Sequence, residues 1–133
     1  MKITNGMLEG LTRTDVLTRL LNCETLPVKV SYQLAKLSKL LDESLKFYLQ
    51  EKNKILDRYC KKDDNGKFIV VDNSLVVQEG KEEQFHSTMR EMFEIENDIP
   101  MERVKINLDD IPKGIVSPAN FAFLELFIEF IVE

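Results

Sequence analysis

The sequence predicts a mostly helical α+β domain, in which one long helix packs in an antiparallel helical hairpin. Apolar residues recur at steps of three and four from Val30 to Tyr59, and neither Gly nor Pro occurs between Val28 and Asn65. This pattern is typical of a single continuous helix. A second helical pattern covers residues 81–96 and should pack back along the first, while short β-forming runs supply the β part.

Length and composition indicate one domain, residues 1–133. The 133 residues are 44% hydrophobic, and no repeat or linker divides them. The net charge is −5, with ten basic against seven acidic residues in 1–60 and eight against sixteen in 61–133. Because phosphate neutralisation needs clustered positive charge, a nucleic-acid binder is not expected. No membrane association is expected either, since the apolar run 121–132 is too short to span a bilayer and contains two Glu.

The helices and strands are expected in the following order. Residues 7–22 form a short amphipathic helix after Asn5-Gly6, and the long helix covers about 28–62. At 1.5 Å per residue, the long helix would measure about 50 Å. This is more than a globule of this size needs as its diameter, so part of the helix should protrude or pack against a partner.

The remaining elements are shorter. Asp63 to Gly66 form a turn, and the runs 67–71 and 75–78 around Asp72-Asn73-Ser74 form either a hairpin or an extended loop. Alternation of apolar residues predicts a strand over 104–108. Ser117 and Pro118 are suited to cap and open a final apolar helix that runs to about Ile131.

Four sequence blocks resemble a known family. They are Lys2 to Gly6 with its Asn-Gly, the block LPVKVSYQLAKL from Leu26 to Leu37, the acidic Gly turn 63–66, and Ser-Pro-Ala-Asn at 117–120. In order and spacing they are similar to a family of small proteins of unknown function, encoded by bacteriophages and prophages of Gram-positive hosts. The resemblance implies a viral protein in the host cytoplasm or the virion. It brings no catalytic residues.

No catalytic, cofactor-binding or metal-binding residues are expected, and the protein is not expected to be an enzyme. His86 is the only histidine, and no local signature links it to Ser, Cys or Asp. Cys23 and Cys60 form no CxxC pair, so we interpret them as structural thiols in a reducing compartment. An EF-hand register would place Lys61 at the first ligand position, which favours a plain turn at 63–66. No phosphate-binding glycine motif occurs.

Two charged surfaces have alternative interpretations. Seven basic residues of the long helix share an arc of about 120°: Lys29, Lys36, Lys39, Lys46, Lys54, Arg58 and Lys61. They could follow phosphates, but Asp42, Glu43, Glu51 and Asp57 precede some of them by three or four residues. A solvated, self-paired face is therefore favoured. The segment 79–110 has ten acidic against four basic residues, typical of either solubilising charge or an inhibitor that mimics DNA.

The apolar end of the chain is the predicted protein-binding surface. On a helical wheel its apolar residues cover about 240°, more than one packing face requires. Leu124, Phe127 and Ile131 should anchor it in the core. One of its two flanks should meet a protein partner or a second copy in a homodimer. The flank is either Phe123, Leu126 and Phe130 or Phe121, Ile128 and Val132.

These features predict a non-enzymatic phage accessory protein that acts through protein–protein contacts, in virion assembly or as a virion component. The alternative is a phage-encoded inhibitor that blocks a host or defence protein such as a nuclease, with its acidic 79–110 segment as the contact surface.

Overall fold

A computed structural model describes residues 1–132 and confirms the mostly helical α+β class. The helices are α1 (Asn5–Leu11), α2 (Val16–Leu21), α3 (Val28–Tyr59), α4 (Glu82–Glu94) and α5 (Pro118–Leu124), with a 3-10 turn η1 at Leu108–Asp110. The strands are β1 (Lys2–Thr4), β2 (Val70–Val71), β3 (Ser74–Leu75), β4 (Glu96–Asp98), β5 (Val104–Asn107) and β6 (Ile128–Ile131).

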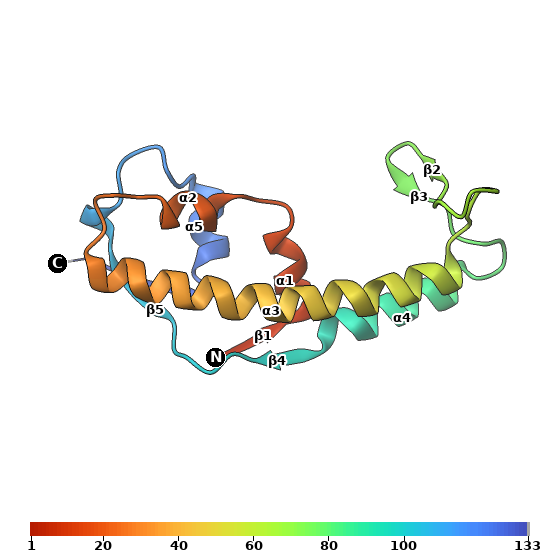
Figure 1. Ribbon diagram of the computed structural model, residues 1–133, viewed down its shortest axis with the longest axis horizontal. Helices are drawn as coiled ribbons and strands as arrows, with labels where there is room; N and C mark the ends of the chain where they lie inside the picture. The colour runs from red at the N-terminus through yellow and green to blue at the C-terminus, as the bar shows by residue number, and fades with distance from the viewer. Residues whose placement is uncertain (133) are drawn as a thin grey trace.

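The long helix and its antiparallel partner are confirmed. α3 begins directly after Pro27, whose extended backbone precedes the first turn, and α4 runs back along its distal half (Figure 1). The buried side chains of α3 follow the predicted helical spacing, including Leu34, Leu37 and Leu41. α3 ends at Tyr59 and not at residue 62, because Cys60 is extended and forms a β-bridge with Val77.

The predicted single helix over 7–22 is wrong, since the chain forms α1 and α2 with a break between them. Thr12 and Thr14 explain the break. The Thr12 hydroxyl donates to the Glu9 carbonyl at 2.7 Å, and the Thr14 hydroxyl accepts from the Val16 amide at 3.2 Å. Such local side-chain bonds compete with the helical ladder, so they end one helix and begin the next.

The predicted final helix to Ile131 is also wrong beyond Leu124. Its start is as expected, since the Ser117 hydroxyl accepts from the Asn120 amide at 3.2 Å. After α5 the chain turns and enters β6, which pairs in parallel with β5. An apolar run alone fits a helix or a buried strand equally well, and here the partner strand decides.

The other strand pairs are short. β1 and β4 pair antiparallel, which the sequence did not predict, because Glu96–Asp98 is wholly polar. Of the two interpretations of residues 67–78, the hairpin is confirmed, because β2 and β3 pair antiparallel. Both strands are shorter than the predicted runs. β5 ends at Asn107 rather than at residue 108, since the Asn107 side chain accepts from the Asp109 amide and caps η1.

The molecule divides into two regions, which we name the head and the arm. The head comprises residues 1–48 and 92–132 and contains the whole main hydrophobic core. The arm comprises residues 49–91: the distal half of α3, most of α4 and the 60–81 segment that joins them. In Figure 1 the arm extends to the right of the head, and the β2–β3 hairpin lies above the distal end of α3, with its turn directed back toward the head.

Candidate functional site

The predicted C-terminal binding flank lies mostly against the core. Phe121, Phe123, Leu126 and Phe130 are half-buried and pack on core residues. The three phenylalanines take part in two edge-on ring pairs: Phe121 with Phe130 at 5.0 Å between centroids, and Phe123 with Phe127 at 5.5 Å. Such pairs stabilise packing beyond the area they bury. These four side chains therefore serve the head and offer only part of their surface to a partner.

The two remaining flank residues have opposite environments. Ile128 is fully buried, so it is not accessible to a partner in this structure, whereas Val132 is 75% exposed. Of the three predicted anchors, Leu124 and Phe127 are fully buried, but Ile131 lies at the exposed margin. These positions were assigned on a helical wheel. In the strand β6, successive side chains instead point to opposite faces, so the predicted grouping no longer applies.

The β2–β3 hairpin at the distal end of the arm exposes apolar side chains that the prediction missed. Val70 and Val71 are 57% and 55% exposed, and Leu75 is also exposed. The tight turn between the strands has positive φ at Asp72 and Asn73, as two-residue hairpins of the favoured twist require. Because neighbouring strand residues point to opposite faces, this hairpin is apolar on both faces. The two apolar runs on either side of Asp72-Asn73 were the available sequence signal.

A network of backbone bonds attaches the hairpin to the arm. The Lys61 amide donates to the Val76 carbonyl and the Gln78 amide to the Tyr59 carbonyl, each at 2.8 Å. The Asp63 carboxylate accepts from the Asn65 and Lys67 amides at 2.9 and 3.0 Å. Asp63 therefore stabilises a turn, and the apolar hairpin is presented on an ordered base.

A basic groove lies between the first turns of α3 and strand β5. It encloses about 790 Å³ and is lined by Lys29, Val30, Tyr32, Gln33, Lys36, Met101, Glu102, Arg103, Val104 and Lys105. Four of these side chains are cationic and one is anionic, although the chain as a whole carries −5. The groove is thus suited to an anionic ligand.

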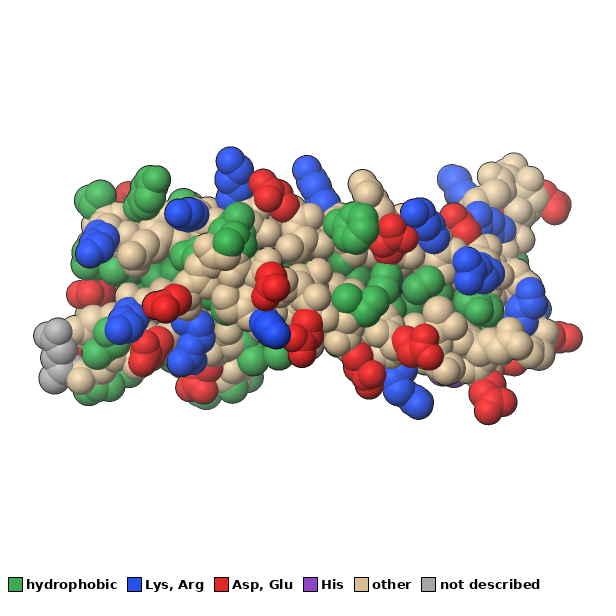
Figure 2. Space-filling model, turned by 90° about the horizontal axis from the view of Figure 1, so that it is seen from below, with side chains coloured by type: hydrophobic (Ala, Val, Ile, Leu, Met, Phe, Trp, Pro, Cys, Tyr) green, Lys and Arg blue, Asp and Glu red, His purple; other side chains and the backbone are tan. Residues whose placement is uncertain are grey.

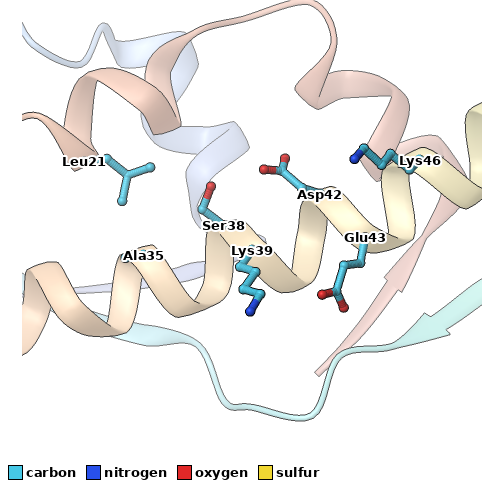
Figure 3. A pocket seen from close by; sticks show the side chains of 7 residues that line it. All are labelled: Leu21, Ala35, Ser38, Lys39, Asp42, Glu43 and Lys46. Carbon is cyan, nitrogen blue, oxygen red and sulfur yellow. The ribbon is translucent and has the colours of Figure 1, made fainter.

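A smaller hollow of about 450 Å³ lies on α3 beside α2 (Figure 3). Ser38, Asp42 and Lys46 point from α3 toward one side, while Lys39 and Glu43 point toward the other. The side chains do not converge on one point, and acidic and basic groups alternate along the helix. This hollow offers no single charge to a ligand.

The most connected titratable cluster joins α1 to α3. The Glu9 carboxylate accepts from the Tyr48 hydroxyl at 2.7 Å and from the Lys52 ammonium at 2.8 Å. Burial raises the pKa of Glu9, but the bonds from Lys52 and Tyr48 and the nearby cations outweigh it, so the pKa is lowered. Burial and then the Glu9 contact raise the pKa of Tyr48. Every group in the cluster has a partner, which makes it a structural lock.

The other candidate residues remain separate. His86 is exposed on α4, and its ring is tilted at 57° to that of Phe85, with 5.6 Å between the ring centroids. Cys23 and Cys60 are buried free thiols in the head and the arm, and burial raises the pKa of Cys60. Within residues 1–132 no three His, Cys, Asp or Glu side chains gather as a metal site would require, and no helix is long and apolar enough to cross a bilayer.

Comparisons with protein-family models, with curated proteins and with solved structures give no match to this chain.

Proposed function

We propose that this chain is a non-enzymatic accessory protein of a bacteriophage that acts through protein–protein contacts, in virion assembly or as a virion component. The observation that carries the proposal is the arm. It holds an apolar hairpin away from the head, with Val70 and Val71 both more than half exposed. Exposed apolar groups on an ordered projection are typical of a contact element, because burying them in an interface stabilises the complex.

The partner in this proposal is a protein subunit of the particle with an apolar pocket at its surface. The hairpin would insert into this pocket and contact it with both of its apolar faces. The half-buried C-terminal residues and Val132 would form at most a secondary contact. A homodimer would be a different use of these surfaces. The molar mass of the purified chain, measured by light scattering, distinguishes a monomer from a dimer.

The test is mass spectrometry of purified phage particles that carry wild-type or variant chain. We expect the wild type in the particles and the Val70→Asp/Val71→Asp double variant to be lost from them, with its melting temperature unchanged. Asp64→Ser, also exposed on the 60–81 segment, is the matched control and should be retained. Wild-type chain absent from particles would contradict the virion proposal.

A second function is favoured by the acidic segment 79–110. Nine of its ten acidic side chains are exposed; they are Glu79, Glu82, Glu83, Glu91, Glu94, Glu96, Asp98, Glu102 and Asp109. An inhibitor of a nuclease would use such a surface against a basic groove. This function predicts early synthesis, absence from particles, and recovery of one host protein that is lost when Glu91 and Glu94 are changed to Lys.

A further inference from the structure

The solvent-facing side of α3 carries a linear set of cations, which we name the basic track. Its members are Lys29, Lys36, Lys39, Lys46, Lys54 and Arg58, all of them exposed. The seventh residue of the predicted arc, Lys61, is half-buried and lies beyond the end of α3 at Tyr59. α3 has 32 residues and is therefore about 48 Å long. Figure 2 shows several basic side chains along the upper edge of the molecule, the side where α3 lies, with acidic and hydrophobic ones between them. Most charged side chains along the lower edge are acidic.

Few of the carboxylates near the track form ion pairs with it. Among the described residues, Lys54 pairs with Glu51 at 3.2 Å, while Asp57 pairs with Lys62, outside the track, at 2.6 Å. The pairs expected between Lys46 and Asp42 or Glu43 are not formed. The argument for a self-paired face, which made nucleic acid an unexpected ligand, is therefore weakened by the structure.

Two exposed aromatic rings lie among the cations of the track. Tyr32 is 71% exposed and Phe47 is 61% exposed, and both point away from the buried stripe of α3. Fifteen residues separate them, which is about 22 Å along the helix. Large exposed aromatic side chains serve no core, but unpaired bases stack on such rings whatever the sequence.

The basic groove continues the track at the start of α3. Lys29 and Lys36 belong to both surfaces, Tyr32 lines the groove beside them, and Arg103 just before β5 and Lys105 in β5 add cations across the groove. One continuous surface thus combines a concave basic end, a straight row of lysines and two open rings. Lysines act as point charges toward phosphates, and the rings give a reason to prefer a nucleic acid over an acidic peptide.

We propose that the basic track and groove bind single-stranded nucleic acid without sequence specificity. A length of about 48 Å falls within what a strand of roughly 4–16 nucleotides can occupy. A duplex is a poorer ligand, because its bases are stacked and unavailable to Tyr32 and Phe47. This site is independent of the hairpin contact, and either function can fail without the other.

The test is fluorescence anisotropy of labelled oligothymidylate and oligouridylate of about 20 nucleotides, at salt from about 50 to 200 mM. We expect both to bind, with a log–log salt slope near −3.5 if about five phosphates are neutralised. Lys36→Glu/Lys39→Glu/Lys46→Glu should weaken binding about tenfold or more. Tyr32→Ala/Phe47→Ala should weaken it about thirtyfold or more, because two stacking rings are lost, with the salt slope unchanged.

The control is Lys67→Glu/Lys81→Glu/Lys113→Glu, which changes the net charge equally at exposed positions off the track. Its affinity for the oligonucleotides should fall by about threefold at most, because only long-range charge is altered. An equal loss of affinity in both triple variants would contradict the proposed site. The proposal would also be wrong if neither oligonucleotide bound the wild type at about 50 mM salt. Tighter binding of polyglutamate than of the oligonucleotides, at equal charge, would overturn it in favour of an acidic peptide.

Discussion

The head and the arm are built from the same long helix but are stabilised very differently. The main core draws seventeen buried residues from the head and none from 49–91. The arm has only three buried hydrophobic residues of its own: Leu56, Cys60 and Met89. The arm is otherwise stabilised by the packing of α3 against α4, by the Tyr59–Phe85 ring contact at 6.0 Å, and by the backbone hydrogen bonds of the 60–81 segment.

This difference assigns separate roles to the two regions. The head can fold around its own core and hold the first half of α3 rigidly, while the arm depends on the continuity of that helix. Regions with few buried apolar contacts open at lower free energy than the core. We therefore expect the arm to open first while the head remains folded.

The largest expected effect is in the head core. Phe127 is fully buried, so Phe127→Ala should lower the free energy of unfolding by about 3–5 kcal/mol. Phe85 is half-buried in the arm, and Phe85→Ala should cost only about 1–2 kcal/mol. Urea unfolding followed by circular dichroism measures both losses. Equal losses would show that the arm is as well packed as the head.

A proline placed within α3 tests the continuity of the helix in each region. Lys39→Pro, in the head, should cost about 3 kcal/mol or more, because proline removes a backbone bond and clashes with the preceding turn. Asn53→Pro, at an equally exposed arm position, should release residues 49–91 and leave the head folded. Hydrogen exchange resolves the two outcomes. Loss of protection throughout the head in Asn53→Pro would mean one cooperative unit.

The two cysteines report on the two regions without any substitution. Cys60 in the arm is 2% exposed and Cys23 in the head is 8% exposed, so static exposure alone favours modification of Cys23. If the arm opens first, Cys60 should instead be alkylated about tenfold faster in mild urea, since a buried thiol reacts only after opening. Mass spectrometry after iodoacetamide pulses measures the ratio. Faster labelling of Cys23 would reverse the proposed order of opening.

Acid should weaken the lock between α1 and α3. The pKa of Glu9 lies below its ordinary value of 4.5, so folding favours the ionised carboxylate. The contribution of Glu9 to the free energy of unfolding is fully present above its ordinary pKa. It is lost as the pH falls through the pKa of the folded state. Melting temperature should therefore fall less between about pH 5 and about pH 3 in Glu9→Gln than in wild type. Glu79→Gln, at an exposed arm position, should behave as wild type.

Local patterns in the sequence predicted the elements that depend on local information. The spacing of apolar residues fixed α3 to within three residues at its end, and Ser117-Pro118 placed the start of α5. The breaks did not follow from apolar spacing, because Thr12 and Thr14 compete through side-chain bonds that a hydrophobic pattern does not register.

Tertiary pairing explains the remaining differences. β6 forms a strand because β5 lies beside it, and β4 is a strand although Glu96–Asp98 is polar. The C-terminal binding surface was inferred from a helical wheel, but β6 replaces the end of that helix and buries Ile128. The β2–β3 hairpin, which was not considered as a binding surface, exposes Val70, Val71 and Leu75. The basic arc was seen in the sequence, but the exposure of Tyr32 and Phe47 required the structure.

The smallest expected effect concerns the tightness of head packing, at the contact between α1 and α5. A Cβ on Gly10 would lie 2.8 Å from Cε2 of Phe123, and that ring is held by Phe127. Gly10→Ala should therefore cost about 1 kcal/mol, since overpacking outweighs the gain in helix propensity. Gly6→Ala, whose nearest neighbour would be the Phe93 carbonyl oxygen at 3.5 Å, should gain about 0.5 kcal/mol instead. Thermal melts of the two variants give the comparison. If Gly10→Ala is as stable as Gly6→Ala, the ring of Phe123 yields, and the head is less rigidly packed at this helix contact than its buried core implies.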